Sequence, residues 1–159
     1  VRIIDPTVWP HQRAEQNFGS YRNLVRGVLL APPCTEFAGS GARWWAEKPD
    51  SLLSDAIATV RAFLNVVEVV RPSWWALENP VGRLVHFLGE PRYTFDPCDH
   101  GDPYTKRTCL WGDFTTPKRC PVEPTEGSKM HLLPPSPDRA AKRSETPMGF
   151  ANAFFEANP

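Results

Sequence analysis

Two short segments of the chain carry residue types suited to covalent catalysis. Cys34 stands in "PPCTEF", directly after prolines that end an apolar stretch, and Glu78 begins "ENP", directly after the apolar "WWAL". A thiolate is a strong nucleophile whose reactivity is tuned at an exposed strand end, and a carboxyl group is a suitable general acid. Each residue alone has a plainer interpretation, because isolated cysteines usually fill cores and acids often cap helices.

The elements expected around these residues bring them together. Residues 24–31 and 73–78 have the apolar character of strands buried on both faces, and the apolar residues of 50–71 recur with helical spacing. A strand–helix–strand unit of this kind makes its strands parallel, and ligands bind beyond the carboxyl ends of parallel strands. We therefore expect Cys34 and Glu78 at one edge of a sheet.

The remainder of the chain predicts further short elements within one domain over 1–159. Residues 1–5, 92–95 and 108–114 read as strands, and the C-terminal segment contains closing helices. Residues 113–145 show little regular pattern and are rich in proline, which favours turns and irregular connections.

Composition excludes several classes of protein. The formal net charge is zero, so no global basic field indicates nucleic acid, and any DNA-binding face must be local. No apolar run reaches the length of a membrane span, and no signal-peptide pattern begins the chain. The four cysteines lack CxxC spacing, which favours a reduced, cytoplasmic protein without membrane partners.

Three segments resemble a known family in the correct order. "PPCTEFAGSG" and "ALENPVGRL" resemble the Pro-Cys and Glu-Asn motifs of the cytosine-5 DNA methyltransferases, most closely their compact, phage-type members. "GDPYTKRTCLWG" (101–112) resembles the later motif in which two alternating arginines lead into a strand. The resemblance implies an α/β fold of the Rossmann-like, S-adenosylmethionine-dependent methyltransferase type, with a mostly parallel sheet flanked by helices.

The resemblance also implies roles for the residues of these motifs. Cys34 would attack carbon 6 of a cytosine while Glu78, oriented by Asn79, protonates nitrogen 3 of the ring. Carbon 5 would then take a methyl group from the cofactor S-adenosylmethionine, after the target base has been flipped out of DNA. Lys106 and Thr108 align with the family's arginines and are the remaining catalytic candidates.

Cofactor and DNA contacts are expected from the same resemblance. The candidate cofactor-binding residues are Asp5, Pro33, Leu53 and Asn152. The glycine-rich loop 38–49 is suitably placed to close over DNA, with Arg43, Trp44, Trp45 and Lys48 as candidate DNA-binding residues. A second interpretation, to which we give the same weight, is that the two tryptophans cover the core.

The chain also departs from the family pattern. No Phe-x-Gly-x-Gly motif precedes Cys34, so we expect a methyltransferase domain truncated at its N-terminus, with weak cofactor affinity. Residues 113–145 are too few for a full target-recognition domain. The alternative function is therefore a catalytically incomplete, methyltransferase-like protein that binds nucleic acid.

Two further classes are disfavoured. A cysteine hydrolase would require a histidine near Cys34, and none is convincingly placed. Zinc would require a ligand spacing that Cys98, His100, Cys109 and Cys120 do not show, so we expect no metal site.

Overall fold

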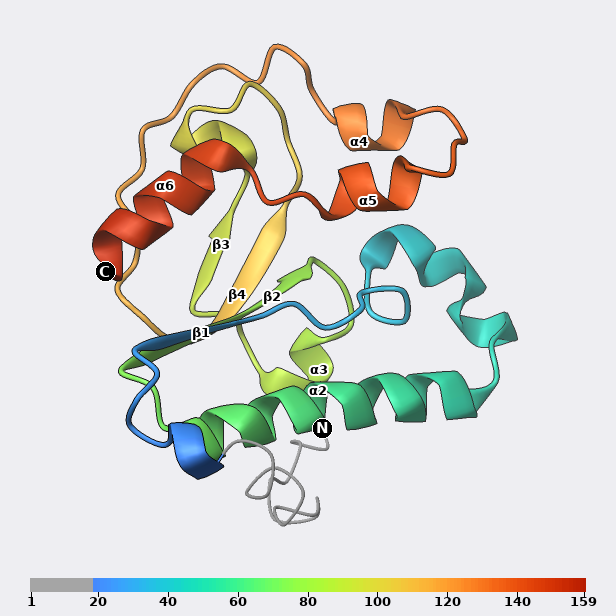
Figure 1. Ribbon diagram of the computed structural model, residues 1–159. Helices are drawn as coiled ribbons and strands as arrows, with labels where there is room; N and C mark the ends of the chain where they lie inside the picture. Colours follow the sequence, from blue (N-terminus) through green and yellow to red (C-terminus); the bar gives the residue numbers. More distant parts are fainter. Residues whose placement is uncertain (1–18) are drawn as a thin grey trace. The chain divides into compact units, whose positions relative to one another are not determined.

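The sheet is built on a parallel pair of strands joined by the longest helix. The computed structural model describes residues 19–159 and begins its sheet with β1 (Gly27–Leu30), followed by α2 (Asp50–Val70) and β2 (Trp74–Pro80) (Figure 1). β1 and β2 pair in parallel, with Leu30 opposite Leu77. The expected strand–helix–strand unit is confirmed.

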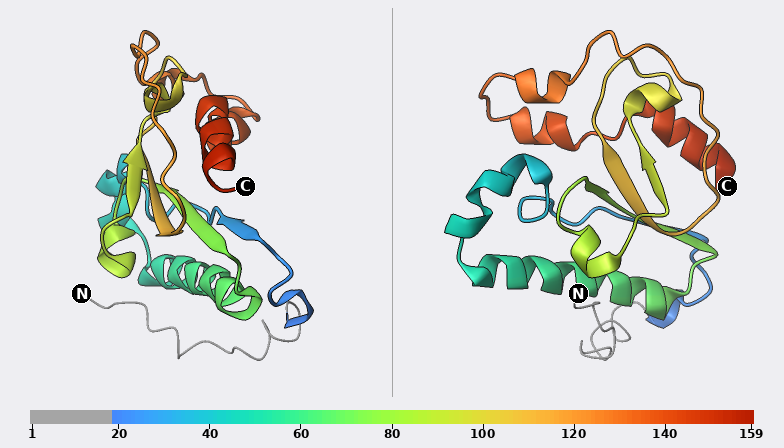
Figure 2. Two further views of the ribbon diagram at one scale, coloured as in Figure 1. Left: turned by 90° about the vertical axis from the view of Figure 1, so that its left-hand side faces the viewer. Right: turned by 180° about the vertical axis from the view of Figure 1, so that it is seen from behind.

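α2 forms because its apolar residues recur with the period of a helix and have a core to fill. Val60 on α2 is fully buried in one cluster with Leu30 of β1 and Leu77 of β2. Figure 2 shows α2 lying along the β1–β2 pair. The helix ends at Arg71, whose φ of 52° is left-handed, and Pro72 cannot continue the helical hydrogen bonding.

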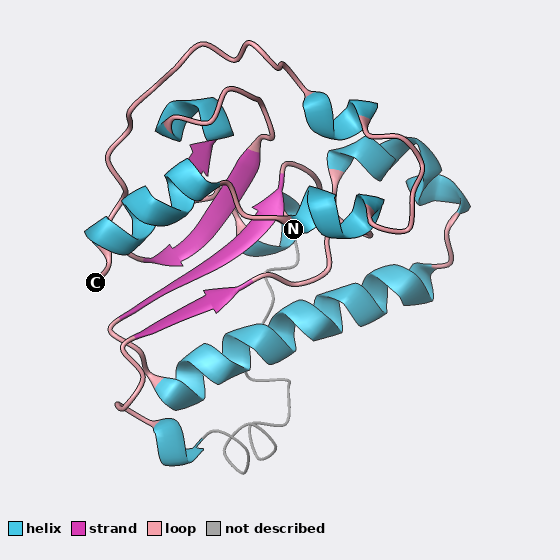
Figure 3. Cartoon of the chain, turned by 45° about the horizontal axis from the view of Figure 1, so that its top comes forward, coloured by secondary structure: helices cyan, strands magenta, loops and turns pink. Residues whose placement is uncertain are grey.

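The sheet formed by the described residues is small and mixed. Its order is β1-β2-β4-β3, with β3 at Tyr93–Phe95 and β4 at Thr108–Asp113. Only β1 and β2 are parallel among the described strands, and the arrow of β4 points opposite to theirs (Figure 3). The expectation of a mostly parallel, Rossmann-like sheet is therefore wrong. A further parallel neighbour would need another long crossover, whereas the proline-containing chain between β2 and β3 forms only the short α3 (Val85–Leu88).

The described residues form two compact units. The first comprises residues 19–93 with Cys109–Phe114, and it contains the β1–α2–β2 core. The second comprises Thr94–Thr108 with Thr115–Pro159. The organisation as one methyltransferase-like domain over 1–159 stays a prediction.

The second unit has a small aromatic core and short helices. The rings of Phe95 and Phe150 stack at 3.9 Å between centroids, and the His100 ring lies edge-on to Phe150 at 5.5 Å. Asn158 binds the backbone of Thr115 through both side-chain atoms, at 2.7 and 2.9 Å. Its helices are the 3-10 helix Pro97–His100, α4 (Lys129–Leu132), α5 (Arg139–Ser144) and α6 (Met148–Ala157).

Two local expectations have mixed outcomes. Closing helices are confirmed by α5 and α6. Of the segment 113–145, predicted to be irregular, residues 114–128 contain neither helix nor strand, but α4 and α5 also lie within it, so the prediction is wrong for these two helices. The strand predicted over 1–5 lies outside the described residues. The segment expected as an open, glycine-rich loop is instead a 3-10 helix over Gly39–Glu47, so most of it has regular structure.

Candidate active site

Cys34 and Glu78 follow the same end of the parallel strand pair. Leu30 ends β1 opposite Leu77, which places Glu78 directly beyond this pairing and Cys34 in the loop that leaves β1. Cys34 is exposed and Glu78 is half-buried. β2 extends to Pro80, two residues beyond the end predicted at Glu78, so Glu78 lies within the strand and not at its last position. The two candidate residues are thus carried by neighbouring strands of one unit.

Asn79 connects the two strand ends directly. Its side chain is fully buried, and its Nδ2 donates a hydrogen bond to the carbonyl oxygen of Pro32 at 3.1 Å. The amide therefore fixes the chain just before Cys34 against the residue that follows Glu78. The Oδ1 of Asn79 has no hydrogen-bond partner among the described residues, which is a cost that a purely structural asparagine rarely carries.

The loops beyond the strands are also joined through their backbones. We call residues 31–38 the cysteine loop and residues 81–84, which follow β2, the glycine loop. The N–H of Gly39 donates to Val81 at 2.8 Å, and the N–H of Arg83 donates to Phe37 at 2.9 Å. A Cβ on Gly82 would lie 1.8 Å from the Phe37 carbonyl oxygen, so only glycine permits this approach.

A charged cluster that the sequence analysis missed lies between these loops. The Glu36 carboxylate forms one ion pair with Lys48 at 2.7 Å and another with Arg83 at 3.7 Å. Arg83 also donates from Nε to the Glu36 carbonyl oxygen at 2.6 Å. The available signal was the position of Glu36 inside the cysteine motif and of Arg83 just after the Glu-Asn motif.

The candidate DNA-binding residues have unequal surroundings. The Arg43 guanidinium lies 3.9 Å from the ring centroid of Trp44, and both side chains are exposed. Trp45 is half-buried under the guanidinium of Arg83, 4.4 Å away, and Lys48 pairs with Glu36. The exposed pair remains accessible to a partner, whereas Trp45 and Lys48 also hold the local structure together.

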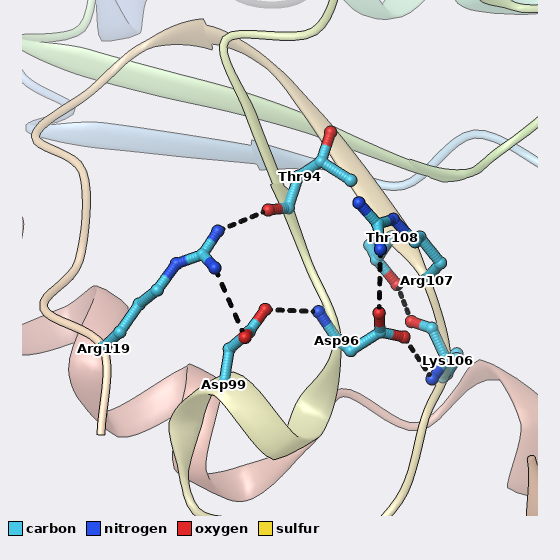
Figure 4. A network of polar contacts seen from close by, with 7 residues as sticks. All are labelled: Thr94, Asp96, Asp99, Lys106, Arg107, Thr108 and Arg119. Carbon is cyan, nitrogen blue, oxygen red and sulfur yellow. Dashed lines mark hydrogen bonds and ion pairs between the residues drawn. The ribbon is translucent and has the colours of Figure 1, made fainter. Parts of the chain in front are cut away.

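Lys106 and Thr108 belong to a polar network in the second unit (Figure 4). The N–H of Lys106 donates to Asp96 at 3.0 Å, and its Nζ donates to the Glu145 carbonyl oxygen at 2.9 Å. Thr108 is buried, and its hydroxyl donates to the Lys106 carbonyl oxygen at 2.8 Å. These contacts shape the turn that enters β4. Roles of the two residues in binding cytosine stay predictions.

Two aspartates organise the same network. Asp96 and Asp99 cap the 3-10 helix reciprocally, with the Asp96 N–H donating to Asp99 at 2.8 Å. Arg107 pairs with Asp96 at 3.4 Å, while Arg119 pairs with Asp99 at 3.3 Å and donates to the Thr94 carbonyl oxygen (Figure 4). The Asp-x-x-Asp spacing could have predicted this cap from the sequence.

Burial and nearby charges shift the pKa of groups in the second unit. Burial raises the pKa of the Cys98 thiol, and the carboxylates of Asp96 and Asp99 raise it further, which makes Cys98 a poor nucleophile. Burial lowers the pKa of His100 below its ordinary value of 6.5. Burial also raises the pKa of Tyr104, with Asp102 adding to the effect.

The candidate cofactor-binding residues are described separately, because they do not all belong to one unit. Pro33 is exposed, and Leu53 packs against the core of the first unit. Asn152 is exposed in the interior of α6 in the second unit, not at a helix start. Asp5 lies outside the described residues. Roles of these residues in binding S-adenosylmethionine stay predictions.

Two comparisons with known proteins bear on the family of this chain. A scan against protein-family models finds no match for this chain, and a search of the curated proteins finds none either. None of the described helices has both the length and the apolar character of a membrane span. Within residues 19–159, no group of three or more histidine, cysteine or acidic side chains is arranged to hold a metal ion.

Proposed function

We propose that this chain is a DNA cytosine-5 methyltransferase in which Cys34 is the nucleophile and Glu78 the acid that activates the base. DNA is the partner, and the reaction passes through a covalent bond between Cys34 and cytosine. No described contact marks a site for S-adenosylmethionine, the methyl donor that the resemblance implies. The chemistry proposed for the described residues is therefore confined to activation of the cytosine.

The observation that carries the proposal is the joining of the two strand ends. Cys34 and Glu78 follow a hydrogen-bonded parallel pair, and the buried Asn79 holds the segment before Cys34 at 3.1 Å. An exposed thiol and a half-buried carboxyl group at neighbouring strand ends suit attack on one small ring and proton transfer to it.

The bonds can be followed through one cycle of activation. The Cys34 Sγ forms a bond to carbon 6, the carbon 5–carbon 6 double bond shifts, and nitrogen 3 takes a proton from Glu78. Carbon 5 is now an enamine carbon and takes a proton from water. The hydroxide that this water leaves removes the original carbon 5 hydrogen, and the electrons of that bond re-form the carbon 5–carbon 6 double bond as Cys34 departs as a thiolate. Return of the nitrogen 3 proton to Glu78 regenerates cytosine. The net reaction exchanges the carbon 5 hydrogen with solvent.

This exchange tests the proposal without any methyl donor. Single-stranded and duplex DNA carrying tritium on cytosine carbon 5 would be incubated with the protein, and tritium released to water would be counted. We expect release by the wild type, loss of release in Cys34→Ala, and a large decrease in Glu78→Gln. Cys120→Ala, which removes another exposed cysteine, is the matched control and should retain the wild-type rate.

The alternative function predicts a different outcome. A catalytically incomplete relative would retain labelled DNA in a binding assay but release no tritium, and Cys34→Ala would bind DNA like the wild type. The exposed Arg43–Trp44 pair is the observation that favours such binding, because an exposed aromatic ring can stack on a base and the adjacent guanidinium can contact a phosphate.

A further inference from the structure

Arg83 of the glycine loop contacts the cysteine loop through its side chain, and no sequence motif predicts these contacts. Its side chain is 14% exposed, donates from Nε to the Glu36 carbonyl oxygen at 2.6 Å and pairs with the Glu36 carboxylate at 3.7 Å. Its guanidinium also covers the ring of Trp45 at 4.4 Å. One planar group thus touches a backbone carbonyl, a carboxylate and an aromatic face, which is a combination that lysine cannot reproduce.

Glu36 lies within the turn that Cys34 begins. The Cys34 carbonyl oxygen accepts hydrogen bonds from the N–H groups of Phe37 and Ala38, at 2.9 and 2.8 Å. Glu36 is therefore enclosed in a tight turn, and its side chain is 12% exposed. A contact that moves Glu36 moves the backbone of Cys34 with it.

The same cluster also reaches the 3-10 helix Gly39–Glu47, which contains two tryptophans and is called the aromatic helix below. Lys48 follows that helix and pairs with Glu36 at 2.7 Å, while Trp45 within the helix lies against Arg83. Three segments therefore meet at Glu36 and Arg83, which are the cysteine loop, the aromatic helix and the glycine loop. A carboxylate held by two cations in a largely buried place keeps a fixed geometry, because release of either partner leaves a poorly solvated charge.

We propose that Arg83 and Glu36 are positioning residues that set the Cys34 turn against the end of β2 that carries Glu78. This proposal rests on the proposed function for its catalytic consequence. The geometric part, the placement of the Cys34 turn by Arg83, stands independently of any reaction on DNA.

Arg83→Met tests the placement, because it keeps the length of the side chain and removes the guanidinium. Arg92→Met is the matched control in the same unit, since Arg92 also has an ion pair at 3.7 Å, to Asp113, and an aromatic neighbour, Phe114. Three readouts are needed, which are tritium release at saturating DNA, the Kd for DNA, and the pH profile of Cys34 alkylation by iodoacetamide, followed by peptide mapping.

The expected results separate positioning from general damage. Because small misplacements of reacting groups cost up to about 100-fold, we expect Arg83→Met to slow release at saturating DNA by about 10-fold or more while Kd changes less than about threefold. The alkylation profile should move to higher pH. Loss of the Arg83 charge leaves only Lys48 to balance the Glu36 carboxylate, and the more negative surroundings disfavour the Cys34 thiolate. Arg83→Lys should recover part of the rate, and Arg92→Met should match the wild type.

The outcomes that overturn the proposal differ from those that overturn the function. Equal release rates and superimposable alkylation profiles for Arg83→Met and the wild type would refute positioning. If the wild type releases no tritium, the proposed function fails and the alkylation profile alone decides the placement. Should Arg83→Met fail to fold by circular dichroism, Glu36→Gln takes its place, because it keeps the side-chain volume and removes the charge. Its alkylation profile should move to lower pH, since it removes an anion and leaves both cations, and a profile identical to that of the wild type would refute positioning.

Discussion

At the scale of single residues, Asn79 links the segment that precedes Cys34 to the strand that carries Glu78. The resemblance implies a role in orienting Glu78, and the observed contact reaches further, to the Pro32 carbonyl on the other strand end. The hydrogen bond is buried, so removal of one partner would leave the other without a hydrogen bond and without water to replace it. The residue therefore contributes both to folding and to the placement of Cys34.

Asn79→Asp tests this contact at nearly constant volume. An aspartate presents oxygen, not N–H, to the Pro32 carbonyl, so we expect the free energy of unfolding to fall by about 1–3 kcal/mol. Urea denaturation measures the change. Asn152→Asp, on the exposed side of α6, is the control and should stay within about 0.5 kcal/mol of the wild type. An equal effect of both substitutions would contradict the proposed importance of the buried contact.

His100 gives the second prediction at this scale. Because burial lowers the pKa of folded His100 below 6.5, the unfolded chain binds the proton first as the pH falls. Stability is therefore complete above pH 6.5 and decreases as the pH falls from there toward the lowered folded value. We expect His100→Phe, which keeps the ring contacts with Phe95 and Phe150, to reduce this slope in urea denaturation at several pH values.

His86 provides the matched control for that measurement. It is exposed, and His86→Gln should leave the acid slope of the wild type intact. A slope that persists unchanged in His100→Phe would show that other groups carry the acid sensitivity.

The close approach of the two loops belongs to the scale of elements. The cysteine loop and the glycine loop are bridged at Ala38 and Gly82, with the Arg83 N–H bound to Phe37. This isolated antiparallel bridge lies beyond the parallel β1–β2 pair and makes the two motifs one substructure. The parallel pair was predictable because α2 has a clear helical period, whereas the bridge depends on an approach that no periodicity encodes.

Gly82→Ala tests the bridge. A methyl group at this position would lie 1.8 Å from the Phe37 carbonyl oxygen, so the loops must separate. Overpacking of this kind costs about 1–3 kcal/mol, and we expect at least this loss in the free energy of unfolding together with slower tritium release. Gly41→Ala is the control, because its Cβ would meet the nearest atom at 3.9 Å, an ordinary contact. Similar behaviour of both variants would contradict the close approach.

At the scale of the whole molecule, the sequence predicted elements better than their assembly. The strands at 27–30, 74–80, 93–95 and 108–113 and the helix at 50–70 lie close to their expected positions. The direction of β4 was not predictable from hydrophobic pattern, since a strand buried on both faces reads alike in either direction. The Glu36–Arg83 cluster was missed for a related reason, because ion pairs between distant segments leave no local spacing to recognise.

The division into two units also bears on the candidate site. Cys34, Glu78 and Asn79 lie in the first unit with their supporting contacts, while Lys106 and Thr108 lie in the second and are engaged in its own network. The residues of the first unit are therefore the ones whose chemistry the described contacts support. Base activation by Cys34 and Glu78 is accordingly the step that we propose for this chain.

The most direct test of that claim is release of tritium from cytosine carbon 5, compared between the wild type, Cys34→Ala and Cys120→Ala. We expect time-dependent release by the wild type and by Cys120→Ala, with release by Cys34→Ala reduced to the rate of DNA alone. Release by Cys34→Ala at the wild-type rate, or no release by a folded wild-type protein that binds the DNA, would contradict it.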